Sequence, residues 1–129
     1  MEKTNFEKLD FYKISEKLSD LIWETVLIWP QLAQRTFGEQ VIRSADSIGA
    51  NIAEGSGRGT PPDNRRFLRM ARGSLYETRH WLRRAHSRKL LTKNQTDQIS
   101  QFISELTPKL NAYIGKVDGT VANNRKGVS

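Results

Sequence analysis

The spacing of the apolar residues restricts this chain to a helical fold. They recur at intervals of three and four residues in four separate stretches, and no stretch shows the sustained apolar–polar alternation of a half-buried strand. A period of this kind places the apolar side chains on one face of a helix. Because the stretches are joined by short connections, we predict an all-α chain that forms an antiparallel up-down four-helix bundle.

The predicted helices follow from these stretches. The first covers about 10–29, the second carries an apolar row over 41–52, and the third covers about 61–86. The fourth carries an apolar row over 99–117, and Pro108 inside that row predicts a kink. The apolar face of the first helix consists of Phe11, Ile14, Leu18, Leu21, Ile22 and Ile28.

Start signals and length complete the predicted layout. Three hydroxyl residues stand three positions before an acid or amide, the pattern of a capping box: Thr36 with Glu39, Thr60 with Asp63, and Thr92 with Gln95. A chain of 129 residues fits one domain. We expect the bundle to cover residues 1–118 and a flexible basic tail to cover residues 119–129.

Positive charge is concentrated in one part of the sequence. The whole chain carries a net charge of +7, whereas residues 58–89 alone hold ten Lys or Arg against two Asp or Glu. Such a balance favours an acidic partner, such as nucleic acid, an anionic membrane surface or an acidic protein. Nine of the ten cations are arginines, whose planar guanidinium can bind a phosphate through two hydrogen bonds.

A row of arginines with one tyrosine runs along the predicted third helix. On an ideal wheel these arginines lie within roughly 40° of a common line and about 115° from the centre of the apolar face, so the row should border the buried seam and face a groove. We predict that nucleic acid binds to Arg65, Arg69, Arg72, Tyr76, Arg79 and Arg83. Two alternatives stay open: a solvated helix face, or a subunit contact with carboxylates such as Glu16, Asp20 and Glu24.

Residues that could catalyse a reaction or bind a metal ion are scarce. The chain has no cysteine, and its two histidines, His80 and His86, lie about 120° apart around a helix and so cannot share a metal ion. No histidine shares a segment with Ser44, Ser47 or Ser56 to activate the hydroxyl. We predict no catalytic residue, no enzyme activity, no metal and no cofactor.

The sequence also indicates where the protein works. No apolar run approaches the roughly 18 residues of a membrane-spanning helix. Charges interrupt residues 1–10, where a signal peptide needs apolar side chains. We expect a cytoplasmic protein with no membrane partner.

A polar cluster, Asn51, Glu54, Gly55 and Arg58, closes the second predicted helix. Glu54 precedes Arg58 by four residues, the favourable order for an ion pair on one helix face. Because glycines break the helix here, we interpret Asn51 and Glu54 as structural residues that hydrogen-bond to the backbone of the next loop. A phosphate cradle is the alternative. Trp81, at the edge of the third helix's apolar face, is our candidate for a subunit contact.

Two segments of the sequence have a distinctive composition. The first segment consists of Arg43, Ser44, Ala45, Asp46, Ser47, Ile48, Gly49, Ala50, Asn51, Ile52, Ala53, Glu54, Gly55, Ser56, Gly57 and Arg58. The second consists of Arg66, Phe67, Leu68, Ala71, Arg72, Gly73, Ser74, Leu75 and Glu77. Together they resemble a bacterial family of four-helix bundles named for proteins encoded in intervening sequences of 23S rRNA genes, and the similarity extends over nearly the whole bundle.

The resemblance implies an assembly and a set of partners. The family is expected to form a homopentameric ring of four-helix protomers without catalytic activity. It also resembles the accessory variability protein of diversity-generating retroelements, a basic pentamer that binds a reverse transcriptase and nucleic acid. We therefore predict a non-enzymatic oligomer that contacts structured RNA, or a complex of RNA with a reverse transcriptase. The alternative is a structural oligomer that binds an acidic protein and no nucleic acid.

Overall fold

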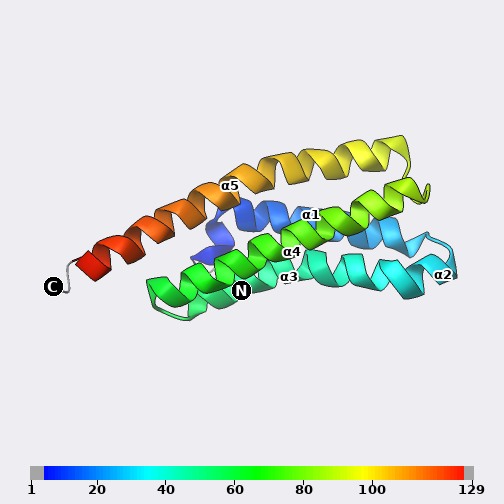
Figure 1. The fold of residues 1–129 in the computed structure, drawn as a ribbon. Coiled ribbons are helices and arrows are strands. Elements are labelled where there is room, and N and C mark those ends of the chain that lie inside the picture. The colour runs from blue at the N-terminus through cyan, green and yellow to red at the C-terminus, as the bar shows by residue number, and fades with distance from the viewer. Residues whose placement is uncertain (1–4, 127–129) are drawn as a thin grey trace.

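Four long helices make up most of the chain (Figure 1). The structure, a computed structural model, describes residues 5–126, and no strand occurs within that range. The long helices are α1 (Asp10–Leu27), α3 (Glu39–Gly57), α4 (Pro61–Ser87) and α5 (Lys93–Lys126). The short elements are η1 (Phe6–Lys8), α2 (Gln31–Ala33) and the π-helical η2 (Gln34–Gly38).

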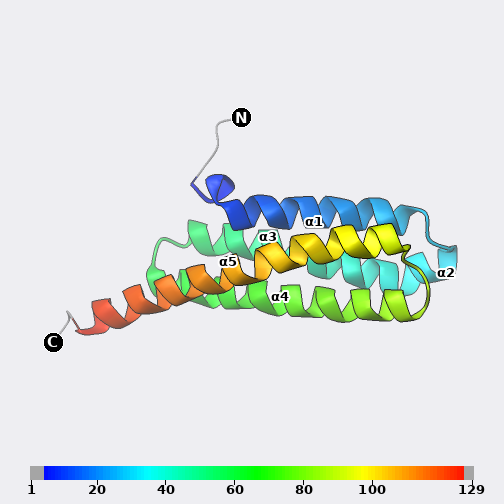
Figure 2. The ribbon, with the colours of Figure 1, turned by 90° about the horizontal axis from the view of Figure 1, so that it is seen from above.

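The four long helices form one bundle. α3 packs against α1 and α4, and α5 packs against the same two helices from the other side, so α1 and α4 lie diagonally. In Figure 2 the chain runs along α1 to the α2 end, returns along α3, advances along α4 and returns along α5. This course is compatible with the predicted up-down arrangement.

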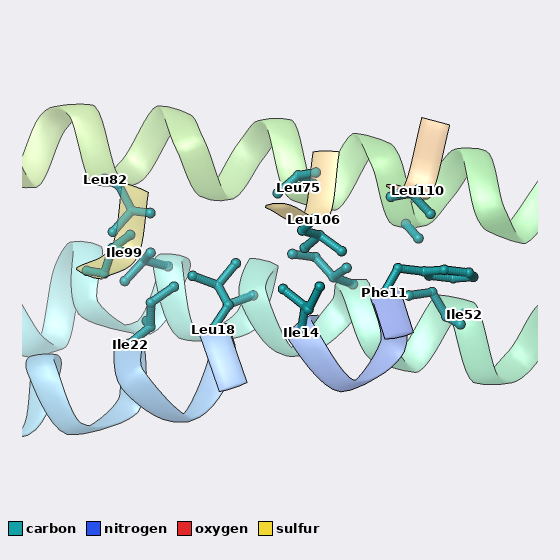
Figure 3. Close-up of a cluster of buried hydrophobic side chains, with 14 of the residues drawn as sticks. Phe11, Ile14, Leu18, Ile22, Ile52, Leu75, Leu82, Ile99, Leu106 and Leu110 are labelled. Carbon is teal, nitrogen blue, oxygen red and sulfur yellow. The ribbon is translucent and has the colours of Figure 1, made fainter. Parts of the chain in front are cut away.

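The interior consists of the apolar faces that the spacing predicted. Leu18, Leu75 and Leu106 are fully buried, and Figure 3 shows side chains from the four long helices meeting in one cluster. Burying one such leucine contributes about 1.5–3 kcal/mol relative to an exposed one. The assignment of Ile28 to this face was wrong. α1 ends at Leu27, and Ile28 follows it with non-helical backbone and is 76% exposed.

The three predicted capping boxes have different outcomes. The one before α5 is confirmed: the Thr92 N–H donates to Gln95 Oε1 at 2.9 Å, and the Gln95 N–H donates to Thr92 Oγ1 at 3.1 Å. Thr60 occupies the N-cap of α4, but its side chain makes no capping hydrogen bond. The start at Thr36 was wrong, because the helix has already begun at Gln31. The Thr36 hydroxyl donates instead to the Leu32 carbonyl at 2.8 Å.

α5 continues past the predicted end of the bundle. Residues 119–126 are helical rather than a loose tail, and Val121 is buried in the core cluster. Val121 lies one helical turn after Val117, so the same apolar face reaches the start of α4. Residues 127–129 of the predicted tail lie outside the described residues. Pro108 lies inside α5, whose course bends in Figure 2.

Candidate nucleic-acid interface

One end of the arginine row on α4 is paired with an acid on α5. Arg69 Nη2 lies 3.1 Å from Asp118 Oδ1, and Arg65 Nε lies 3.8 Å from the same oxygen. The Arg65 side chain is only 24% exposed, so packing as well as charge holds it against α5. A single carboxylate therefore offsets part of the charge of two arginines.

The next arginine in the row is also tied to α5. Arg72 Nη1 donates to Asn111 Oδ1 at 3.3 Å in a partly buried contact. Its partner is therefore on α5 rather than on α3. We call Arg65, Arg69 and Arg72 the paired half of the row.

The other end of the row has no acidic partner among the described residues. Arg79 and Arg83 are exposed, and neither forms an ion pair in the described part of the chain. They line a groove of about 650 Å³ between α4 and α5. Its apolar floor includes Leu82 and Ile99, which are both buried. We call Arg79 and Arg83 the open half of the row.

The two aromatic candidates have different surroundings. Tyr76, between the two halves in sequence, is 50% exposed and forms no ring–ring and no cation–π contact among the described residues. Trp81 packs inside the protomer, with its ring 6.0 Å from Phe37 and 4.9 Å from His80. Its indole N–H is buried without a hydrogen-bond partner. Tyr76 is thus available for stacking, whereas only part of Trp81 reaches the surface.

The polar cluster at the end of α3 holds helices together. Arg58 Nη2 lies 2.8 Å from Glu54 Oε1, as the spacing predicted, and its guanidinium also covers the Phe67 ring at 5.0 Å. A Cβ on Gly55 would lie 2.9 Å from Phe67 Cβ, so the close approach of α3 and α4 requires glycine there. The predicted hydrogen bonds to the loop backbone were wrong: Asn51 donates to the Ser47 carbonyl of its own helix at 2.9 Å, and Glu54 pairs with the Arg58 side chain.

The side of the bundle opposite the basic groove has an acidic hollow. A hollow of about 260 Å³ between α1 and α3 is lined by Glu16, Asp20 and Asp46, and by no Lys or Arg among the described residues. The Tyr12 phenol lies at the edge of this hollow, and its pKa is raised mainly by partial burial and secondly by the nearby Glu16 carboxylate. The α1–α3 hollow and the α4–α5 groove therefore have linings of opposite charge.

Exposed apolar side chains gather where α1 meets α2. Leu27 is 58% exposed, and Ile28 and Leu32 are each 76% exposed. Trp23, one turn before Leu27 on α1, is 54% exposed. Apolar side chains grouped in this way mark surfaces that bind other molecules.

Two further kinds of feature are absent from residues 5–126. No helix there is both long and apolar enough to span a bilayer. No three His, Cys, Asp or Glu side chains in that range come together as a metal site would require.

A model of the 23S rRNA-intervening sequence proteins matches residues 7–112 of the chain. The chain belongs to this family. All residues that line the α4–α5 groove fall inside the matched span, whereas Asp118 falls outside it. No curated protein matches this family member in sequence.

A solved structure has the same fold as this protein. It is the crystal structure of a protein with unknown function from the S23 ribosomal protein family of Bacteroides thetaiotaomicron VPI-5482. The two chains superpose with a TM-score of 0.71 at 23% sequence identity, over 81% of this chain and 97% of the other. At this identity the likeness concerns the fold alone.

Sequence reasoning missed the α5 side of the interface. Asn111 and Asp118 partner arginines that lie 39 and 49 residues earlier in the chain, and no local pattern reports contacts at that separation. Ser100 and Ser104, which face the open half across the groove, were also missed. Their spacing of four residues was the available signal, because it places them on one side of a helix.

Proposed function

We propose that this protein is a non-enzymatic basic binding module that contacts RNA through the open half of the α4 row. The observation that carries the proposal is that Arg79 and Arg83 border a groove with no acid to neutralise them. A guanidinium without an internal partner can direct its two-pronged hydrogen bonds to a phosphate. The name of the family, which refers to 23S rRNA, favours RNA over DNA.

The charge distribution favours one face of the protomer for this contact. Because the α1–α3 face carries Glu16, Asp20 and Asp46, a polyanion is repelled there and attracted to the α4–α5 face. Tyr76, half exposed beside the open half, supplies a ring on which a base can stack. Contacts to phosphates dominate, so we expect little dependence on RNA sequence.

We also propose that the protomers assemble into a ring of five in the cytoplasm. The exposed apolar side chains at the α1–α2 corner form a surface that a neighbouring copy can cover. Trp81 stays our predicted contact residue at the edge of such an interface, and a reverse transcriptase stays the predicted protein partner. Light scattering at micromolar concentration should give five protomer masses; a stable monomer would exclude the ring.

The RNA contact is tested by fluorescence anisotropy with a labelled RNA over a range of salt concentrations. Affinity should fall steeply with salt as counterions are released from the phosphates. The Arg79→Gln/Arg83→Gln variant should bind roughly tenfold more weakly or worse, and its salt slope should be lower by about 1.4, which is 0.7 for each lost contact to a single strand.

Arg65→Gln/Arg69→Gln is the matched control, because it removes the same charge from the same helix. It should lower affinity by no more than about threefold, since Asp118 already occupies those arginines. Wild-type protein that binds no RNA at low salt would exclude this function and favour the acidic protein partner instead.

A further inference from the structure

The groove beside the open half has a second wall of hydroxyl groups. On α4 its lining includes Arg79, Arg83 and Ser87, and on α5 it includes Thr96, Ser100 and Ser104. Each set repeats every four residues, so each forms a row along one side of its helix, advancing about 6 Å per step. α4 and α5 run side by side (Figure 2). The arginines of α4 and the hydroxyl groups of α5 therefore border the groove from opposite sides.

Two of the three hydroxyls of the α5 row, those of Ser100 and Ser104, are unoccupied. The side chains of Ser100 and Ser104 make no hydrogen bond within residues 5–126. By contrast, Thr107 and Thr120 of the same helix donate to the carbonyl one turn earlier, at 2.8 and 3.2 Å. Ser100 and Ser104 are also exposed. Their O–H groups are therefore free to donate to a ligand.

The rest of the lining favours an anion. No Asp or Glu is among the described residues that line the groove, whereas His80, Arg84 and His86 add further donors along its α4 side. Leu82, Ile99 and Ile103 provide an apolar floor that excludes water from beneath a bound group. A floor of this kind lowers the local dielectric and strengthens charge-assisted hydrogen bonds above it.

We propose that this groove is a two-walled phosphate site, in which the guanidinium groups of Arg79 and Arg83 and the hydroxyls of Ser100 and Ser104 bind the same phosphate chain from opposite sides. The inference rests on the proposed function and extends it, because it places the RNA strand in the groove rather than along the whole row. The arginines neutralise the charge of the phosphates. The hydroxyls donate hydrogen bonds to their oxygens and fix the position of the strand across the groove.

The serine pair gives the decisive test. Ser100→Ala/Ser104→Ala should weaken binding of a labelled uridine oligonucleotide about tenfold with an unchanged salt slope, because it removes two donors and no charge. Alanine favours helix at both positions, so α5 stays folded. The matched control is Gln98→Ala/Gln101→Ala, which removes two exposed polar side chains of α5 that do not line the groove. It should bind within twofold of wild type.

A second probe, inorganic tripolyphosphate measured by calorimetry, separates the two proposals. We expect wild type to bind both probes and the serine pair to weaken both. If wild type binds RNA and the serine pair binds it equally well, the two-walled site is overturned while the RNA function stands. If tripolyphosphate binds and depends on the serines but RNA does not bind, the phosphate site stands and the RNA function falls. If wild type binds neither probe, both proposals are overturned.

Discussion

The two halves of the α4 arginine row differ in what α5 places opposite them. Both halves have the same residue type and lie on the same side of the same helix, yet Arg65 and Arg69 meet Asp118, while Arg79 and Arg83 meet a groove without acids. The number of cations along α4 therefore overstates the charge available to a partner. The facing helix decides which arginines stabilise the bundle and which can bind a ligand.

The same contrast separates packing from recognition. The paired half lies where α5 bears Asn111 and Asp118, whose side chains reach across to α4. The open half lies where α5 bears serines, which are too short to reach a guanidinium and leave the groove between the helices unfilled. The pair of helices α4 and α5 thus has polar contacts at one end and an open groove at the other.

Charge reversal should produce the largest difference between the halves. Arg79→Glu/Arg83→Glu should abolish measurable RNA binding, a loss of more than about a hundredfold, because it converts the groove from attractive to repulsive. Its melting temperature should stay near that of wild type, since neither side chain has an internal partner. Anisotropy and thermal melts followed by circular dichroism measure the two effects.

The same reversal in the paired half is the control. Arg65→Glu/Arg69→Glu places two carboxylates beside Asp118 and should lower the melting temperature, with a smaller loss of affinity. If both variants lost RNA binding equally while remaining folded, the distinction between the halves would be wrong.

Tyr76 gives the next largest effect and tests how far the binding surface extends beyond the groove. Tyr76→Ala should weaken binding of single-stranded RNA about tenfold, because stacking of one base contributes roughly 1–3 kcal/mol. Tyr76→Phe should keep the affinity. Met70→Ala removes another exposed large side chain of α4, beside the paired half, and should change nothing. If Tyr76→Ala bound RNA as tightly as wild type, base stacking on Tyr76 would not contribute, and RNA would bind through phosphate contacts alone.

Much of the fold was predictable because its signals are local. The apolar spacing gave the buried faces of α3 and α4, and the Thr92–Gln95 box marked the start of α5. The errors occurred where a local signal competed with neighbouring structure. Thr36 has the residues of a cap, but a helix that begins at Gln31 places it in an interior turn.

The candidate site was predictable only on one of its two sides. A helical wheel locates the arginine row on α4, because that row depends on a single helix. It cannot show that Asp118 neutralises one end of the row, since the register between α4 and α5 is set by how their apolar faces pack. Serines in a sequence do not by themselves indicate a site. Ser100 and Ser104 become candidates only because the packing of α5 on α4 places them across the groove from Arg79 and Arg83.

Removing the acid that pairs with the paired half should make two of its arginines available to RNA, as those of the open half are. Asp118→Asn releases Arg65 and Arg69, so RNA affinity should rise about threefold and the salt slope should increase by up to about 1.4. Asp10→Asn is the matched control: it also removes one acid, but that acid lies near Lys109 on the α1 side of the bundle. An equal gain in both variants would mean that net charge alone, and not the release of particular arginines, controls binding.

The smallest effect concerns stability and compares single arginines of the two halves. Arg72→Gln removes a partly buried hydrogen bond to Asn111, so it should lower the free energy of unfolding by about 1 kcal/mol. For a chain of this size that corresponds to a fall in melting temperature of about 4 °C, provided that protein concentration is held fixed because assembly also affects the melt. Arg79→Gln makes the same chemical change where residues 5–126 offer the side chain no partner, and its melting temperature should match that of wild type. Asn111→Ala should reproduce the loss seen in Arg72→Gln, and the double variant should lose little more than either single one, because both changes remove the same contact. If the two losses instead add in full, Arg72 and Asn111 act independently, and Arg72 then belongs with the open half as a residue available to RNA.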